Sequence, residues 1–201
     1  MMELVLVRHA EPVRITDSAG PADPGLTPLG YEQSERLAQW LEHESIDQIA
    51  TSPLLRARET ALPLAKRLDI EPVVEPRITE YDAHAKEYIP VEELLATNPD
   101  WKNEMAEGRW SNEGGLSAED FQAQVVAGFE HLIEQFSSQR VVAVCHGGVI
   151  NVYLAHVLKN DKKMWFYPHY TSISRVHAAS SGVRSIGSVN EIGHLTATRD
   201  A

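Results

Sequence analysis

The sequence predicts an α/β fold, in which helices cover a mostly parallel central sheet that ends in an antiparallel edge. Residues 4–7 and 141–145 are short runs of apolar, mostly branched residues, a pattern typical of strands buried on both faces of a parallel sheet. Segments with helical periodicity separate the strand-like segments. Near the end of the chain, residues 172–178 and 183–189 flank a Ser-Ser-Gly turn and predict a hairpin at the sheet edge.

The composition predicts a single domain over residues 1–201. The chain has 43% hydrophobic and 23% charged residues, as expected for a globular protein, and its longest apolar run is far too short to span a membrane. A formal net charge of −11 disfavours nucleic acids and anionic membranes as partners. The single cysteine, Cys145, and a strand that begins directly at the N-terminus favour a cytoplasmic protein without a signal peptide.

The first strand leads into a loop at 13–26 that is rich in Gly, Pro, Asp and Ser and is well placed to cover a site. Thr27 and Pro28 then provide an N-cap and a first helical residue. They predict a helix to about Glu44, followed by a short strand at 48–51. One face of that helix carries Leu29, Leu37 and Leu41.

Ser52 and Pro53 repeat the cap-then-proline pattern and predict a helix that begins there and ends at about Leu68. Arg56 falls in its first turn, where the positive end of the helix dipole makes a cation unfavourable. Two interpretations stay open for this residue. It forms a salt bridge with Glu59 or Glu32, or its guanidinium and the helix end together bind an anion.

Residues 71–76 predict a short strand bordered by prolines, and residues 77–82 predict a strand end with acidic groups. Residues 83–115 are less regular and contain a predicted short helix at 91–97. We interpret 83–115 as a cap inserted over the site. Its aromatic residues either line an apolar subsite or form the small core of the insertion; they include Tyr88, Trp101 and Trp110.

A serine at 117, with acidic residues after it, predicts a helix that extends to about Phe136. The second buried strand follows at 140–145 and ends at His146, before two glycines and a helix at 149–158. Two strands therefore end in histidines, His9 and His146. Ligands of open α/β sheets bind outside the carboxyl ends of strands, so we expect these side chains to meet at one site.

Five residues form the candidate site: Arg8, His9, Arg56, Glu80 and His146. Arginine is permanently charged and binds phosphate oxygens in a bidentate manner. Histidine is a competent nucleophile that divides a difficult displacement into two easier ones. A nearby carboxylic acid can protonate the departing oxygen. This combination favours phosphoryl chemistry.

Other chemistries have less support. The chain has no His-x-His or His-Glu-x-x-His pattern, so no metal site or cofactor is predicted. Cys145 and His146 are adjacent and should point to opposite faces, so Cys145 is interpreted as a small buried apolar residue. Of the remaining histidines, His84 and His169 lie where a loop could bring them to the site.

Three separated motifs resemble those of the histidine phosphatase superfamily, the phosphoglycerate-mutase-like group with an Arg-His-Gly signature. They are Arg-His-Ala at 8–10, Ser-Pro-Leu-Leu-Arg-Ala-Arg-Glu-Thr-Ala at 52–61 and Cys-His-Gly-Gly-Val-Ile at 145–150. Their order and spacing match over nearly the whole chain. The resemblance implies a three-layer α/β/α sandwich and a metal-independent phosphatase that acts on a small phosphorylated metabolite.

The resemblance also implies a role for each site residue. His9 would be the phosphorylated nucleophile, and the phosphate pocket would be completed by Arg8, Arg56, His146 and Gly147. The acid of the family falls on Glu80; the alternatives for this role are Asp82 and Glu87.

The chain departs from the family pattern after His9. Ala10 replaces the usual glycine, and the usual asparagine is absent, so Arg14 or Thr16 would have to supply its phosphate contact. The missing mutase-type context favours a hydrolase over a phosphoglycerate-mutase-type phosphotransferase. A non-catalytic module that binds phosphorylated ligands is a third interpretation, and a plain α/β domain with incidental histidines is a fourth.

Overall fold

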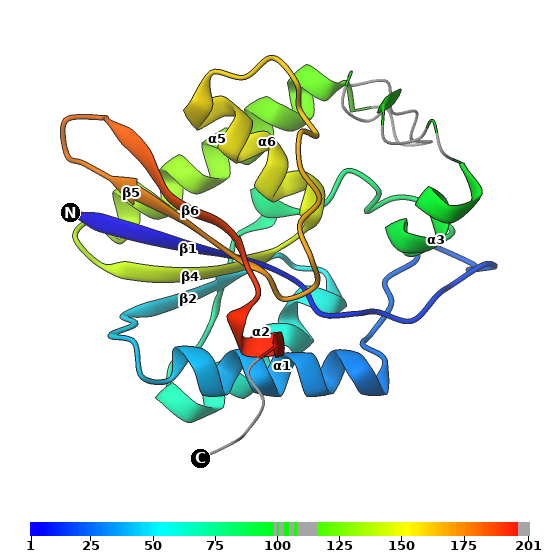
Figure 1. Ribbon diagram of the computed structural model, residues 1–201, viewed down its shortest axis with the longest axis horizontal. Helices are drawn as coiled ribbons and strands as arrows, with labels where there is room; N and C mark the ends of the chain where they lie inside the picture. The colour runs from blue at the N-terminus through cyan, green and yellow to red at the C-terminus, as the bar shows by residue number, and fades with distance from the viewer. Residues whose placement is uncertain (99, 101–102, 105–106, 108–115, 197–201) are drawn as a thin grey trace.

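The computed structural model describes residues 1–98, 100, 103–104, 107 and 116–196. Within these residues, six strands form one mixed sheet in the order β3-β2-β4-β1-β5-β6. Helices cover both of its faces, as Figure 1 shows, so the predicted three-layer α/β/α fold is confirmed. The strands are β1 (Met2–Arg8), β2 (Gln48–Thr51), β3 (Val73–Val74), β4 (Arg140–Cys145), β5 (Ile173–Ala178) and β6 (Arg184–Glu191).

The parallel pair β1 and β4 forms the centre of the sheet. The register aligns Leu4 with Val141 and Arg8 with Cys145, so the two strands end at the same level. Side chains alternate between the faces of β1: Leu4 and Leu6 enter the core on one side, whereas Val5 and Val7 enter the core on the other. Both faces of β1 are therefore buried, as the apolar run predicts.

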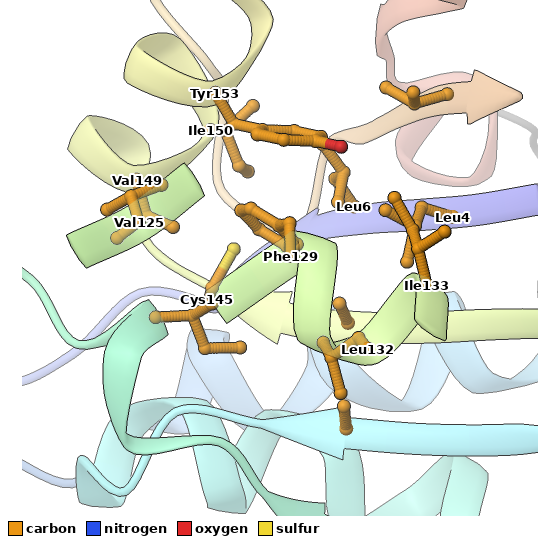
Figure 2. Close-up of a cluster of buried hydrophobic side chains, with 14 of the residues drawn as sticks. Leu4, Leu6, Val125, Phe129, Leu132, Ile133, Cys145, Val149, Ile150 and Tyr153 are labelled. Carbon is orange, nitrogen blue, oxygen red and sulfur yellow. The ribbon is translucent and has the colours of Figure 1, made fainter. Parts of the chain in front are cut away.

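One face of the sheet is covered by α5 (Ala118–Gln135) and α6 (Gly147–Leu158). Figure 2 shows the core on this face, where the rings of Phe129 and Tyr153, with centroids 4.4 Å apart, share one cluster with Leu4 and Leu6 of β1. The Ser117 side chain accepts a hydrogen bond from the Asp120 amide and begins α5 as predicted. The next helix begins earlier than predicted, at Gly147, because the His146 backbone itself is the N-cap.

The opposite face is covered by α1 (Pro28–Leu41) and α2 (Leu55–Leu68), seen below the sheet in Figure 1. Two predictions for α1 are wrong. The helix ends at Leu41 rather than Glu44, and Leu29 is 49% exposed instead of sharing the buried face of Leu37 and Leu41. Eight residues separate positions 29 and 37, which places Leu29 about 80° around the helix from Leu37 and outside the buried face.

Helix α2 does not begin at Ser52 and Pro53 as predicted. Its N-cap is Leu54, which provides no side-chain hydrogen bond, while the Ser52 side chain turns toward His146. The segment 77–82 also differs from the prediction of a strand end. Strand β3 consists of only Val73 and Val74. A short 3-10 helix, Pro76–Ile78, follows it, and residues 79–82 form no strand.

The antiparallel edge is the hairpin of β5 and β6, and β5 pairs with β1. A last short helix, α7 (Gly193–Thr196), packs against α1. None of the helices within the described residues combines the length and apolarity needed to cross a membrane. The predicted short helix in the cap segment is present as α3 (Val91–Thr97), but the segment 83–115 lies partly outside the described residues.

Candidate active site

The candidate site lies at the carboxyl ends of β1 and β4. The His9 amide donates a hydrogen bond to the Cys145 carbonyl at 2.9 Å, which extends the strand pairing by one residue. His9 and His146 therefore leave the sheet side by side, with ring centroids 5.2 Å apart. The chain continues from β1 into α1 below the sheet and from β4 into α6 above it (Figure 1), and open α/β sheets form their ligand crevices where neighbouring strands lead to opposite faces.

The hydrogen bond of the His9 ring determines its tautomer. Nδ1 lies 2.8 Å from the Ala10 carbonyl oxygen, which can only accept, so Nδ1 carries the proton. Burial, together with Arg56 and Arg8, holds the pKa of His9 well below its usual range. The imidazole is therefore neutral, and its Nε2 has a free electron pair.

His146 is fully buried behind His9 and does not itself line the cavity. Its Nε2 lies 2.7 Å from the Ser52 hydroxyl, at the end of β2. Burial and the neighbouring Arg56, His9 and Arg8 hold the pKa of His146 well below its usual range, so this ring is also neutral. Ser52 thus orients a histidine instead of capping a helix.

Arg56 extends from the first turn of α2 and is 1% exposed. Its guanidinium contacts Asp82 at 3.1 Å and Asp23 at 4.0 Å, and it stacks over the ring of Tyr88 at 4.6 Å. Glu59, which the sequence suggests as a salt-bridge partner, instead accepts a hydrogen bond from the Leu26 amide. The side chain therefore points toward the cavity rather than along the helix surface.

Arg8 is 4% exposed and is enclosed by the loop before β5. Nη1 donates to the Pro168 carbonyl at 2.6 Å, and the guanidinium lies 3.9 Å from the ring centroid of Tyr170. Burial alone would lower the pKa of Arg8, but Tyr170, Tyr167 and Glu92 outweigh it and raise the pKa. The guanidinium is held as a fixed cation at the end of β1.

Three buried nitrogen atoms at this site have no hydrogen-bond partner among the described residues. They are Nε of Arg8, Nε of Arg56 and Nδ1 of His146. Buried polar groups in folded proteins almost always find a partner, so unpaired ones mark a strained or ligand-binding position. Two permanently charged donors and one imidazole nitrogen gathered around His9 suit a tetrahedral anion.

Glu80 lies on the other side of the cavity, held by backbone amides. Its carboxylate accepts hydrogen bonds from the amides of Gly148 at 2.9 Å and Tyr81 at 3.1 Å. Burial and the nearby Asp82 raise the pKa of Glu80 to about 7, against the opposing effect of these amides and of Arg56. A carboxyl group with this pKa can hold or release a proton near neutral pH.

Gly148 is essential to this arrangement, and its importance escapes the sequence. A Cβ atom at position 148 would lie 2.3 Å from Oε1 of Glu80 and 2.9 Å from Cε of Met164. At Gly147 a Cβ atom would meet ordinary contacts, the nearest being Nε of Arg8 at 3.6 Å. The second glycine of the pair is therefore the one that the carboxylate requires.

The cavity has a volume of about 270 Å³ and is lined by Arg8, His9, Arg56, Glu80 and Gly147 together with thirteen other residues. The two alternative acids, Asp82 and Glu87, also line it. His84 and His169 are exposed and do not.

The two residues proposed to replace the missing asparagine also lie outside the lining of the cavity. Arg14 is exposed and pairs with Glu93 at 2.6 Å, and Thr16 is exposed. Tyr88 lines the cavity, whereas Trp101 and Trp110 lie outside the described residues. Among the residues that the structure describes, no cluster of three or more His, Cys, Asp or Glu side chains could hold a metal ion.

Sequence reasoning also missed the residues that connect the elements of the site. Thr60 accepts a hydrogen bond from the Ala10 amide at 2.9 Å and donates one to the Arg56 carbonyl at 2.7 Å. Its position four residues after Arg56 is the one available signal. Glu92 on α3 contacts Arg8 at 3.4 Å, a contact that no local pattern indicates.

Comparison with known proteins gives a consistent family relationship. The family profile of the histidine phosphatase superfamily (branch 1) matches residues 4–191. A phosphoserine phosphatase 1 of Hydrogenobacter thermophilus is 32% identical over 174 residues, which covers 83% of this chain and 82% of that protein. A probable phosphoglycerate mutase of Yersinia enterocolitica is 28% identical over 165 residues, which covers 79% of this chain and 75% of that protein.

The fold has a solved counterpart of similar extent. A phosphoserine phosphatase mutant from Entamoeba histolytica, crystallised in complex with phosphoserine, superposes with a TM-score of 0.77 and 26% sequence identity. The superposition covers 97% of this chain and 100% of that one. The similarity therefore extends over the sheet and both helical layers.

Proposed function

Because the chain belongs to the histidine phosphatase superfamily, we propose that it hydrolyses small phosphomonoesters through a phosphohistidine intermediate on His9. The observation that carries this proposal is the set of unpartnered buried nitrogens of Arg8, Arg56 and His146 around that ring. A phosphoryl group in the cavity would supply acceptors for the two guanidinium groups, beside the His9 and His146 rings. The names of the relatives, a phosphoserine phosphatase and a probable phosphoglycerate mutase, support a small phosphorylated substrate.

In the first step, Nε2 of His9 attacks phosphorus while the bond to the ester oxygen breaks. The hydrogen bond from Nδ1 to the Ala10 carbonyl supports this role, because it stabilises the positive charge that the ring gains. Arg8 and Arg56 would stabilise the charge on the phosphoryl oxygens. Protonated Glu80 would transfer its proton to the departing oxygen, which leaves as an alcohol.

In the second step, water replaces the alcohol. The Glu80 carboxylate accepts a proton as the water oxygen bonds to phosphorus, and the bond between phosphorus and Nε2 breaks. Inorganic phosphate leaves, while neutral His9 and protonated Glu80 are restored. A carboxyl group with a pKa of about 7 suits both directions of transfer near neutral pH.

His9→Ala tests the proposal directly. We expect wild type to release phosphate from para-nitrophenyl phosphate with a chelator present and to acquire an acid-labile phosphoryl label. The variant should lose both. Labelling of another residue, or full activity of His9→Ala, would refute the nucleophile. Tight binding of phosphate esters without turnover would instead support a non-catalytic binding module.

The mutase alternative predicts phosphoryl transfer between positions of phosphoglycerate in place of net phosphate release. Assays of both products with 3-phosphoglycerate distinguish these outcomes. We further propose a cytoplasmic enzyme without a nucleic-acid or membrane partner, on the basis of the net charge of −11 and the single free, buried cysteine, Cys145.

A further inference from the structure

Resting on the proposed function, we infer that the cavity selects phosphomonoesters of uncharged, apolar alcohols or phenols over esters that carry a second anionic group. Beyond the phosphoryl end, two apolar walls face the cavity. One consists of Ile89, Val91 and Leu94 from the segment around α3, and the other of Met164 and Phe166 from the connection between α6 and β5.

The wall at Phe166 is held rigidly by a buried amide. Asn151 on α6 is 2% exposed and donates from Nδ2 to the carbonyls of Phe166 and Gly147, both at 3.0 Å. Its Oδ1 accepts hydrogen bonds from the amides of Phe166 at 3.1 Å and Trp165 at 3.0 Å. Because Gly147 belongs to the phosphoryl end, Asn151 fixes the apolar wall relative to the reacting group. Such preorganisation reduces the entropic cost of binding.

The other apolar wall, which includes Val91 and Leu94, is linked to the same phosphoryl end of the cavity. Glu92, in the first turn of α3, contacts Arg8 at 3.4 Å and accepts a hydrogen bond from the Tyr170 hydroxyl at 2.7 Å. Just before the helix, Tyr88 exchanges two backbone hydrogen bonds with Ile15, at 2.8 and 3.0 Å. In Figure 1, α3 lies away from the sheet, beside the loop that follows β1. These contacts hold the segment that carries Val91 and Leu94 against the cavity.

The charges around the cavity disfavour an anionic leaving group. Among the lining residues that the structure describes, the cations are Arg8 and Arg56, and both belong to the phosphoryl end. Apart from His9, the remaining ionisable side chains of this lining are those of Glu80, Asp82, Glu87 and the tyrosines. A carboxylate on the leaving group would lose hydration beside apolar walls and acidic residues without gaining a cation from the described lining.

The volume of the cavity limits the size of the leaving group that can bind. Pockets that enclose drug-sized ligands measure roughly 300–1,000 Å³. A cavity of about 270 Å³, part of which the phosphoryl group fills, suits a short alkyl chain or a single ring. Burial of one methylene group favours binding by about fourfold at 25 °C. An apolar subsite therefore predicts a measurable dependence on chain length.

The experiment measures kcat/KM of the full chain for ethyl, butyl and hexyl phosphate, whose leaving groups are chemically alike. We expect an increase of about threefold to fourfold per methylene until the cavity is full. Phosphoserine and 3-phosphoglycerate should be poorer substrates than butyl phosphate. A flat series, or a preference for either carboxylate ester, would overturn the inference.

Variants at Leu94 localise the effect. Leu94→Ala should flatten the chain-length series, and Leu94→Arg should raise kcat/KM for 3-phosphoglycerate relative to hexyl phosphate by at least about tenfold. Leu62→Ala and Leu62→Arg are matched controls, because Leu62 lies on α2, is 47% exposed and is not part of the cavity. Equal effects at both positions would contradict a leaving-group subsite.

Binding of non-hydrolysable alkylphosphonates separates this inference from the proposed function. Calorimetry should give tighter binding of hexylphosphonate than of ethylphosphonate, and weaker binding of phosphonoacetate. If this order holds while no ester is hydrolysed, the subsite stands and the phosphatase proposal fails. If esters are hydrolysed but the phosphonates bind equally, the phosphatase proposal stands and the subsite fails.

Discussion

At the residue scale, one physical cause gives two groups opposite protonation states. Burial disfavours the charged form of any ionisable side chain. For His9 the charged form is the cation, so burial lowers its pKa and leaves a neutral ring. For Glu80 the charged form is the anion, so burial raises its pKa to about 7. Burial thus favours a neutral His9, which can act as a nucleophile, and a protonated Glu80, which can act as an acid, at the same pH.

A leaving-group test separates acid catalysis from positioning at Glu80. Glu80→Gln should lower kcat/KM for alkyl phosphates by about 10²- to 10⁴-fold, because an alkoxide departs poorly without a proton. The loss should be much smaller for para-nitrophenyl phosphate, whose phenolate departs without help. The same factor for both substrates would make Glu80 a positioning residue, and Asp82→Asn and Glu87→Gln would then be the next variants to measure.

The pH dependence follows from the same carboxyl group. Its acid form predominates below a pKa of about 7, so kcat/KM for alkyl phosphates should fall as the pH rises through about 7. Glu80→Gln cannot ionise and should lack this decrease. The control is to measure both enzymes with the same ester, so that ionisation of the substrate cancels. An unchanged profile in the variant would assign the decrease to another group.

Gly148→Ala tests the close approach of the backbone to the Glu80 carboxylate. The added Cβ would lie 2.3 Å from Oε1, so the carboxylate must move away from its amide partner. We expect a loss of activity toward alkyl phosphates that resembles that of Glu80→Gln. Gly20→Ala is the control, because a Cβ there would meet nothing within 4 Å and Gly20 is not part of the cavity lining. Comparable activity of the two variants would contradict this role.

At the scale of elements, α2 is coupled to the end of β1 through Thr60. This hydroxyl bridges the Ala10 amide and the Arg56 carbonyl, and it is fully buried. Thr60→Val keeps the shape but leaves the amide unpaired, which should cost about 1–3 kcal/mol in the free energy of unfolding. It should also lower kcat, because Arg56 and the chain after His9 lose their shared contact.

Thr97→Val is the control for this variant. Thr97 ends α3 and also donates to the carbonyl four residues earlier, at 3.0 Å, but it is exposed. We expect a change in stability of less than about 0.5 kcal/mol for an exposed substitution. Urea denaturation and para-nitrophenyl phosphate assays measure both variants. Equal losses at 60 and 97 would mean that Thr60 has no special coupling role.

At the scale of the whole molecule, Arg8 and Arg56 place two buried cations at one cavity of a chain whose net charge is −11. Inorganic phosphate should bind the folded state there and stabilise it by about 2.7 kcal/mol at one hundred times its Kd. For a chain of this length, that corresponds to an increase in Tm of about 5–10 °C. Differential scanning calorimetry at several phosphate concentrations measures the shift.

Arg56→Ala should remove most of this increase, since it deletes one of the two cavity cations. Arg67→Ala is the matched control, because Arg67 lies on the same helix but pairs with Glu35 and Glu42 at the surface. A phosphate-dependent Tm that persists in Arg56→Ala and disappears in Arg67→Ala would place the anion site elsewhere.

Elements with local signals could be predicted from the amino-acid sequence. Runs such as 4–7 and 141–145 predict buried strands, because a strand covered on both faces needs apolar residues at every position. Thr27 and Ser117 mark helix starts correctly, because an N-cap depends on neighbours only a few residues away. The residues at the strand ends, His9 and His146, could be paired because parallel strands end at one edge.

Contacts between distant segments could not be predicted from local patterns and are seen only in the folded chain. Ser52 has the local signature of an N-cap, yet its hydroxyl contacts His146, 94 positions away, where a buried imidazole needs a partner. Burial and Asp82 raise the pKa of Glu80, and the amide of Gly148, 68 positions later, opposes this increase. The apolar walls of the cavity come from the regions around 89–94 and 164–166. Burial and long-range contact depend on how the chain folds back on itself, which local patterns do not encode.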